Sequence, residues 1–149
     1  MDEVNTHKNY QALVEDRIYF GGASDVEDMV KNEGIEVIVD LRGEATQSAY
    51  PDDDVQWIQV PLGDNTTGPQ DQLFQQAIDH VAQAYHNGKK VGFHCAGGGG
   101  RTGAVAVGTL ITLGKSQTIE EAEALAKSIR ARVNIKPAQR EAIEKLFNT

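Results

Sequence analysis

The sequence is poor in cysteine, in long apolar runs and in positive charge. Its 149 residues include a single cysteine, Cys95, which excludes an internal disulfide and any zinc or iron–sulfur site built from several thiolates. No stretch reaches the roughly 18 apolar residues of a membrane span, and the start MDEVNTHKNY lacks the basic and apolar regions of a secretory signal. We therefore expect a soluble, cytoplasmic protein that does not bind membranes.

The charge balance argues against polyanionic partners. The formal net charge is −8, whereas nucleic acid or an anionic membrane would need a basic footprint on the protein. With 40% hydrophobic and 24% charged residues, the composition is that of a globular protein rather than a disordered chain, a collagen or a coiled coil. At this length we expect one domain spanning residues 1–149, and we expect a monomer.

Strand and helix signals alternate along the chain. Ser24 and Glu27 have the spacing of a capping box, Thr118 and Glu121 form a second one, and Pro137 suits the first turn of a last helix. The pattern predicts strands at 35–41, 55–60 and 89–94, a surface loop at 42–55, and helices at 24–34, 69–88 and 102–114. This order predicts an α/β fold: a single domain with a central, mostly parallel, twisted sheet flanked by helices.

The stretch HCAGGGGRT, residues 94–102, joins a predicted strand directly to a predicted buried helix. A glycine run can be a flexible linker, but linkers separate folded units. A strand, a glycine-rich turn and a helix N-terminus instead bring backbone N–H groups and the positive helix end to one point. Glycine also lets the backbone adopt unusual angles close to a ligand. We therefore predict an anion site.

The residues around the glycines narrow the kind of anion site. The nucleotide-binding template G-x-x-x-x-G-K-[ST] would need glycine at Cys95 and lysine at Arg101, and the dinucleotide template does not fit either. The alternative is that Cys95 is a nucleophile and Arg101 an anion clamp, because the helix end and the guanidinium would stabilise a thiolate and a bound phosphoryl group together. The spacing C-x5-R is weak evidence alone, and a lone cysteine is usually a small buried hydrophobe.

VGFHCAGGGGRTG resembles the H-C-x5-R-[ST] signature of the cysteine-dependent protein tyrosine phosphatase superfamily, in its small dual-specificity branch. The glycine loop is most similar to that of the kinase-associated phosphatase type. The likeness covers most of the chain, including RIYFGG, IEVIVDLRGE, VPLGD and the closing KPAQREAIEKLF. It implies a dual-specificity phosphatase-like fold and a phosphatase that needs no cofactor.

The resemblance also implies a role for each matching residue. Cys95 would attack phosphorus, and Arg101 would bind the phosphoryl oxygens. His94 would hold the loop and favour the thiolate, and Thr102 would hydrogen-bond the sulfur and help it leave. The phosphate cradle would be completed by the backbone amides of Ala96, Gly97, Gly98, Gly99 and Gly100.

Phosphate transfer also calls for an acid that protonates the leaving oxygen, and the family carries it on a separate loop before the cysteine. Asp64 lies 31 residues before Cys95 on a predicted loop and is our candidate, although an aspartate before Asn, Thr and Gly is also a common turn residue. Asp71 is the reserve candidate. The acidic run at 52–54 comes too early and is expected to be a solvated loop.

Two other residues have a less specific signal. Arg42, in DLRGE, follows a strand and either faces the pocket or steadies a loop as a structural arginine. Gln139 matches a family position in the last helix, where we expect it to pack, with contact to the catalytic loop as the alternative.

The sequence therefore favours a metal-independent protein phosphatase that acts on phosphotyrosine through a cysteinyl-phosphate intermediate, with phosphoserine and phosphothreonine left open. One cysteine and four histidines predict no metal cluster. The expected partner is a phosphorylated protein or peptide. Two alternatives stay open: a catalytically weak module that recognises phosphate, and a rhodanese-like sulfurtransferase, whose chemistry needs neither Thr102 nor an acid at Asp64.

Overall fold

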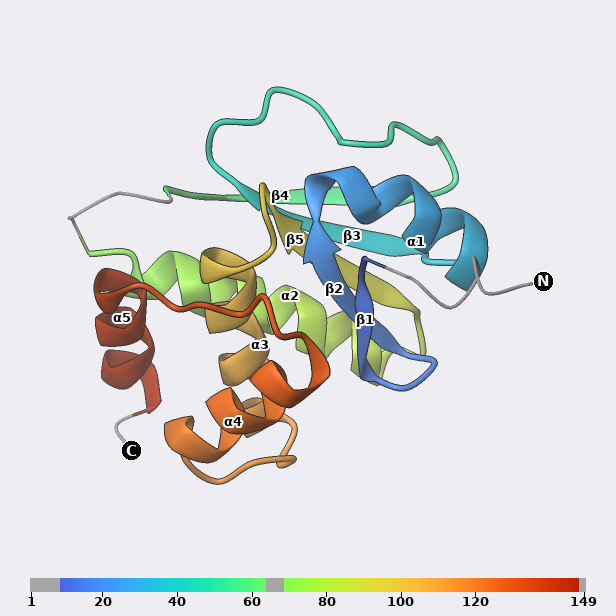
Figure 1. Cartoon of the computed structure of the whole chain (residues 1–149). Helices are drawn as coiled ribbons and strands as arrows, with labels where there is room; N and C mark the ends of the chain where they lie inside the picture. Colours follow the sequence, from blue (N-terminus) through green and yellow to red (C-terminus); the bar gives the residue numbers. More distant parts are fainter. Residues whose placement is uncertain (1–8, 64–68, 148–149) are drawn as a thin grey trace.

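A twisted five-stranded sheet forms the centre of the protein (Figure 1). The computed structural model describes residues 9–63 and 69–147. The strands run in the spatial order β1-β2-β5-β3-β4, and every pairing is parallel except that of β1 with β2. Their bounds are β1 Gln11–Val14, β2 Ile18–Gly22, β3 Val37–Arg42, β4 Gln56–Leu62 and β5 Val91–Cys95. The predicted single-domain α/β fold with a mostly parallel sheet is confirmed.

Helices cover both faces of the sheet (Figure 1). Helix α1 lies on one face, α2 and α3 lie on the other, and α4 and α5 pack against α3. The bounds are α1 Val26–Glu33, α2 Asp71–His86, α3 Gly100–Thr112, α4 Ile119–Ile129 and α5 Pro137–Phe147. Because β2, β5, β3 and β4 all run parallel to one another, their carboxyl ends meet at one edge of the sheet.

The alternation of side chains along β3 and β5 gives the sheet two cores. Val39 of β3 and Phe93 of β5 point into the larger core, which α2 and α3 cover. Ile38 points to the smaller core, which contains Met29 of α1. Because successive strand residues face opposite sides, two polar residues, Asp40 and His94, share the α1 side and are paired in register.

Helix α3 is buried on every side, with each residue from Arg101 to Leu110 buried. This confirms the prediction from its uniformly apolar sequence. Small residues allow the close packing: a Cβ on Gly108 would collide with the Ile78 side chain of α2. Within residues 9–63 and 69–147, no helix is long and apolar enough to cross a membrane.

The structure corrects several predicted boundaries. Ser24 does not cap a helix. A 3-10 turn spans Ala23–Asp25, and Asp25 accepts a hydrogen bond from Gly22 N at 2.8 Å. The capping bond from Glu121 N to Thr118 Oγ1, at 3.1 Å, is as predicted. The β1–β2 hairpin was not predicted, because its two short strands carry no regular alternation of polar and apolar residues.

Candidate active site

Cys95 is the last residue of β5 and stands at the edge where the parallel strands end. The chain passes from it through residues 96–99 into α3, which begins at Gly100. The strand, glycine loop and helix therefore follow each other as the sequence predicted (Figure 1). Ligands of open α/β sheets bind at this edge, so the position itself marks a candidate site.

The sulfur of Cys95 receives two hydrogen bonds. Gly98 N donates to Sγ at 3.2 Å. The single hydroxyl proton of Thr102 has two acceptors in reach, Sγ at 3.0 Å and Gly21 O at 3.3 Å, and the shorter contact is with the sulfur. Cys95 is only 3% exposed, but the alternative of an inert apolar cysteine does not explain two donors directed at its sulfur. Donors stabilise a negatively charged sulfur, so this geometry suits a thiolate.

Each carbonyl group of the catalytic loop, residues 95–99, has a hydrogen-bond partner that lies outside the loop. His94 Nδ1 lies 3.0 Å from the carbonyl oxygen of Cys95, and Ala23 N donates to that of Ala96 at 3.0 Å. Arg130 donates from Nη2 to Gly97 O at 3.4 Å and from Nε to Gly98 O at 2.8 Å. Asn134 N donates to Gly99 O at 3.1 Å.

These bonds fix the direction of the loop amides. In a trans peptide the C=O of one residue and the N–H of the next point in opposite directions, and no peptide among the described residues is cis. With the carbonyls of 95–99 held on the outside, the amides of 96–100 point to the other side, as the bond from Gly98 N to Sγ shows. The loop thus forms a row of donors suited to an oxyanion.

Gly98 is the glycine that the loop conformation requires. Its φ is +80°, and a Cβ there would lie 2.7 Å from the carbonyl carbon of Gly21 and against the guanidinium of Arg130. We predict that Gly98→Ala lowers the free energy of unfolding by about 1 to 3 kcal/mol and severely impairs any turnover that uses Cys95. Denaturant unfolding and steady-state kinetics measure the two effects.

Gly97→Ala is the matched control for this prediction. A Cβ on Gly97 would meet nothing within 4 Å, so its effect on stability should stay within about 0.5 kcal/mol. Equal losses in the two variants would contradict the role assigned to the backbone at Gly98.

The guanidinium of Arg101 is buried and held in one orientation. It is 2% exposed, and Nη1 donates to Leu62 O at 2.9 Å and to Glu44 Oε1 at 2.9 Å. Nη2 donates to Glu44 Oε2 at 3.2 Å. The hydrogen bond from Arg101 lowers the pKa of Glu44, so this carboxylate is charged at neutral pH. Bidentate pairing fixes the plane of a guanidinium as well as its position.

The segment that carries Glu44 is tied to the sheet. Gly43 N donates to Leu62 O at 2.8 Å, and Gln59 Nε2 donates to Arg42 O at 2.7 Å and to Ala45 O at 2.9 Å. The turn that carries Glu44 is therefore fixed by hydrogen bonds to β4. The strands β3 and β4 and this turn thus orient the guanidinium of Arg101 in the absence of a ligand.

His94 is buried beside a buried carboxylate. A carbonyl only accepts, so Nδ1 of His94 carries the proton in its 3.0 Å contact with Cys95 O. Its Nε2 lies 3.8 Å from Oδ1 of Asp40. Burial lowers the pKa of His94, and the nearby Asp40 opposes that effect. This contact is one that the predicted loop-holding role of His94 requires, and the role itself stays a prediction.

Arg42 is engaged with Asp40 rather than aimed at Cys95. Its Nε and Nη2 donate to the two carboxylate oxygens of Asp40, each at 2.9 Å, and Trp57 Nε1 donates to Oδ2 of Asp40 at 3.0 Å. Burial disfavours the charged form of Asp40, but the hydrogen bonds from Arg42 and Trp57 and the nearby His94 together outweigh it, and the pKa of Asp40 lies below its ordinary value. Of the two alternatives for Arg42, the structure supports the one that steadies its surroundings.

Gln139 is packed against Gly100, the first residue of α3, directly after the loop. It is 2% exposed, and its Oε1 accepts from Lys136 N at 2.9 Å. A Cβ on Gly100 would lie 2.7 Å from the same oxygen. Gly100 is thus a glycine because the amide of Gln139 fills the space behind it.

Of the two acid candidates, Asp64 and Asp71, the structure describes only Asp71. Asp64 lies outside the described residues, so its role stays a prediction. Asp71 occupies the first turn of α2, where an acidic residue favourably meets the helix dipole. Asp52 accepts a hydrogen bond from Asp54 N at 2.8 Å, so this run forms a turn in the surface loop, as expected.

Sequence reasoning missed three residues that support the site. Arg130 comes from the end of α4, Glu44 from the turn after β3, and Asp40 from within β3. None of them stands out in the sequence, because an arginine in a helix or an aspartate in a strand becomes informative only when its partners are known. In the structure, the burial of a charged residue is an informative signal, and Arg130 is only 4% exposed.

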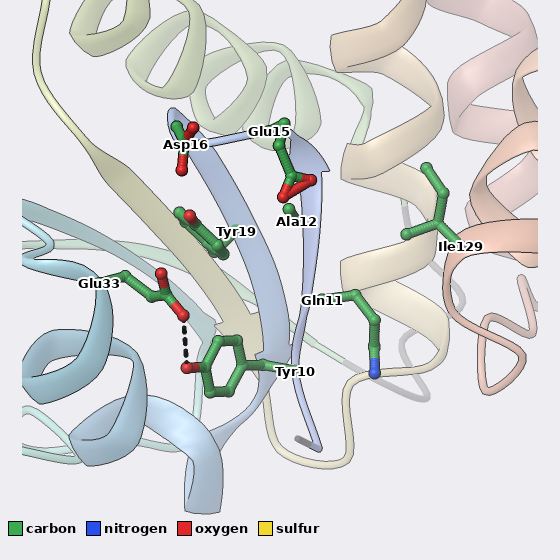
Figure 2. Close-up of a pocket in the computed structure, with 8 residues that line it drawn as sticks. All are labelled: Tyr10, Gln11, Ala12, Glu15, Asp16, Tyr19, Glu33 and Ile129. Carbon is green, nitrogen blue, oxygen red and sulfur yellow. Dashed lines mark hydrogen bonds between the residues drawn. The ribbon is translucent and has the colours of Figure 1, made fainter. Parts of the chain in front are cut away.

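A separate hollow of about 600 Å³ lies beside β1 and β2 (Figure 2). Glu15, Asp16 and Glu33 line it, and Tyr10 Oη donates to Glu33 Oε2 at 2.8 Å (Figure 2). Burial, reinforced by Glu33, raises the pKa of Tyr10 to about 12. Among the described residues its lining contains three carboxylates and no basic side chain, a set that would repel a phosphate.

Metal ligands do not gather in the part of the chain that the structure describes: no three His, Cys, Asp or Glu side chains are placed to hold an ion. The side chains of Cys95, Thr102 and His94 come together around one loop, whereas the guanidinium of Arg101, from the first turn of α3, is held by Glu44 and Leu62 O.

Comparison with known proteins gives a family and a fold. Residues 18–146 match the family described as dual specificity phosphatase, catalytic domain. No curated protein is recognisably similar in sequence. Human DUSP28 superposes with a TM-score of 0.80 at 16% identity, over 94% of this chain and 93% of that one.

Two further solved structures share the fold. Tk-PTP in its active form has a TM-score of 0.77 at 20% identity, over 94% of this chain and 97% of that one. The human tyrosine phosphatase-like serine/threonine/tyrosine-interacting protein has a TM-score of 0.80 at 14% identity, over 94% and 96%. At sequence identities between 14% and 20%, these structural similarities show only that the fold is shared.

Proposed function

The chain belongs to the family of dual specificity phosphatase catalytic domains, and from this premise we propose that it is a metal-independent protein phosphatase that hydrolyses phosphotyrosine through a cysteinyl-phosphate intermediate. We extend the proposal to phosphoserine and phosphothreonine as further substrates. The substrate is a phosphorylated protein or peptide, and the reacting atom of the enzyme is Cys95 Sγ.

One observation carries this proposal: the sulfur of Cys95 accepts hydrogen bonds from Gly98 N and Thr102 Oγ1 within a loop whose carbonyls are held outward. A module that only binds phosphate needs the amides and Arg101, but it does not need a donor such as Thr102 directed at a sulfur. The family match favours neither the binding module nor the sulfurtransferase.

In the first step, the thiolate of Cys95 attacks phosphorus, the S–P bond forms and the P–O bond to the substrate side chain breaks. The amides of residues 96–100 and the guanidinium of Arg101 meet the phosphoryl oxygens, where charge redistributes in the transition state. Asp64 gives its proton to the departing oxygen, which leaves far more easily as a neutral hydroxyl.

In the second step, water attacks the phosphorus of the cysteinyl phosphate and gives a proton to Asp64. The S–P bond breaks and its electron pair returns to sulfur. The hydroxyl of Thr102, 3.0 Å from Sγ, stabilises the thiolate as it leaves. Phosphate departs and the enzyme returns to its starting state, so the cycle consumes only water.

Asp64→Asn tests the acid assignment. We expect kcat/KM, which reports the steps up to departure of the leaving group, to fall about 100-fold on a phosphothreonine peptide, whose leaving alkoxide is strongly basic. The loss should be much smaller on para-nitrophenyl phosphate, which departs without help. Steady-state kinetics on both substrates provides the measurement, and Asp71→Asn is the matched control. A uniform loss on both substrates would remove Asp64 from this role.

The proposal as a whole is tested by phosphate release from a phosphotyrosine peptide and a phosphothreonine peptide in the presence of a chelator. Hydrolysis of the first supports a metal-independent tyrosine phosphatase, and the ratio of the two rates sets the breadth of its specificity. Loss of activity in chelator that a divalent ion restores would overturn the metal-independent mechanism. Binding without hydrolysis would favour the phosphate-recognising module.

We also propose that the protein acts in the cytoplasm. Its chemistry requires Cys95 as a reduced thiol, and the chain has no second cysteine to protect it as an internal disulfide. A reducing compartment keeps such a thiol available. Fractionation of the source cells, with detection of the protein in the cytosol, tests this placement.

A further inference from the structure

A hollow of about 300 Å³ opens within the loop between β3 and β4, and the phosphatase chemistry does not use it. Its walls are largely apolar and come from Tyr50, Pro51, Val55 and Trp57. Asp52 is the one charged residue in its lining. The exposed residues Asp53 and Asp54 follow directly. The two cations beside the hollow, Arg42 and Lys31, are each paired with a carboxylate, so the net charge around the hollow is negative.

This hollow adjoins the phosphate clamp. Thr46, at its rim, is two residues after Glu44, a span of at most about 7 Å, and Glu44 Oε1 lies 2.9 Å from Nη1 of Arg101. Arg42 Nη2 donates to Gln47 O, in the lining, at 3.3 Å.

A second link between the hollow and the active-site loop runs through Trp57, another residue of its lining. Trp57 Nε1 bonds Asp40 at 3.0 Å, and Asp40 is paired in register with His94, the neighbour of Cys95. These contacts link the hollow to Arg101 and to the neighbour of Cys95, so the ligand that suits it is a second side chain of a peptide whose phosphorylated residue is bound at Cys95.

The lining indicates which side chain this is. Arginine and lysine combine a long apolar stem with a charged end, which matches apolar walls beside a carboxylate. Aromatic rings also attract cations across their faces, and Trp57 and Tyr50 provide two. Lys31 lies 6.0 Å from the Tyr50 ring centroid. It is paired with Glu27 at 2.6 Å and does not line the hollow, so it leaves Asp52 available.

We propose that this hollow is a subsite for a basic side chain of the substrate, so that the enzyme prefers phosphopeptides with arginine or lysine close to the phosphorylated residue. The proposal rests on the proposed phosphatase function and specifies its substrate class. The net charge of −8 adds a general attraction for basic peptides, so the test must separate the subsite from that background.

The experiment compares phosphotyrosine peptides that carry arginine or citrulline at each position within about three residues of the phosphotyrosine. Citrulline has the shape of arginine without its charge. For the wild-type enzyme we expect arginine to raise kcat/KM about two- to fivefold over citrulline at one or more positions, the range of a partly exposed ion pair. In Asp52→Asn the preference for arginine should fall to the small background that the net negative charge of the protein produces.

Asp53→Asn is the matched control, because it removes the same charge one residue away from the hollow. Asparagine at 52 can still accept the turn hydrogen bond from Asp54 N, so the loop is preserved. Asp53→Asn should retain the preference for arginine. An equal loss in both variants, or no preference in the wild type, overturns the subsite while leaving phosphatase activity on para-nitrophenyl phosphate intact.

Failure of the phosphatase proposal would show differently, as no hydrolysis of any peptide. In that case calorimetric binding of the same peptides to the wild-type protein decides the matter. Tighter binding of the arginine peptide, lost in Asp52→Asn and kept in Asp53→Asn, supports the subsite. Equal affinities for the arginine and citrulline peptides overturn it.

Discussion

Replacing Cys95 with serine should abolish phosphatase turnover, with kcat reduced by about 10⁴-fold or more. Serine keeps the shape of the side chain and an oxygen that Gly98 N and Thr102 Oγ1 can still reach, since both now lie within 3.2 Å of Sγ. A serine hydroxyl is a far weaker nucleophile than a thiolate at neutral pH. Steady-state kinetics on a phosphotyrosine peptide measures the loss.

The same variant should still bind the phosphopeptide. The amides of residues 96–100 and the guanidinium of Arg101 are unchanged in this variant. Calorimetry should therefore give two affinities that agree within about tenfold: that of Cys95→Ser for the phosphopeptide and that of the wild type for an unreactive analogue of the same peptide. Thermal unfolding should show an intact fold. Appreciable turnover by Cys95→Ser would contradict nucleophilic catalysis by this residue.

Replacing Arg101 with lysine should have the second largest effect, a loss in kcat/KM of about 10²- to 10³-fold. Lysine keeps the positive charge, but it lacks the planar fork that Glu44 holds through two bonds, at 2.9 and 3.2 Å. It therefore cannot meet two phosphoryl oxygens in a fixed plane. The measurement is kcat and KM on the phosphotyrosine peptide, with unfolding followed in parallel.

Arg132→Lys serves as the control for this substitution, since Arg132 is exposed on the segment after α4. It makes the same chemical change near the loop and should alter kcat/KM less than about twofold. If Arg101→Lys were as active as Arg132→Lys, a positive charge at position 101 would be enough for activity. The role assigned to the guanidinium plane, which Glu44 fixes through two hydrogen bonds, would then be wrong.

The catalytic loop was predictable because its residues are close in sequence. Cys95, Arg101 and Thr102 lie within eight consecutive residues, and a strand followed by glycines and a buried helix brings them together by local geometry. The apolar pattern of α3 and the capping residue Thr118 were informative for the same reason, since each acts within its own element.

The supporting residues were not predictable because their partners are distant. Arg130 reaches Gly98 O across 32 positions, and Arg101 reaches Glu44 across 57. Such contacts arise only when α4 packs beside the loop and β3 beside β5, which no local pattern encodes. The β1–β2 hairpin was missed for a related reason, as its strands are stabilised by neighbours rather than by their own periodicity.

The central claim, that Cys95 carries the phosphoryl group during turnover, is tested most directly by trapping that intermediate. Wild-type enzyme is mixed with excess para-nitrophenyl phosphate, quenched rapidly with denaturant and analysed by mass spectrometry of its peptides. We predict a phosphoryl group on Cys95 that forms before steady state and is absent from Cys95→Ser. Turnover without a phosphorylated Cys95, or with the phosphoryl group on another residue, would contradict the mechanism.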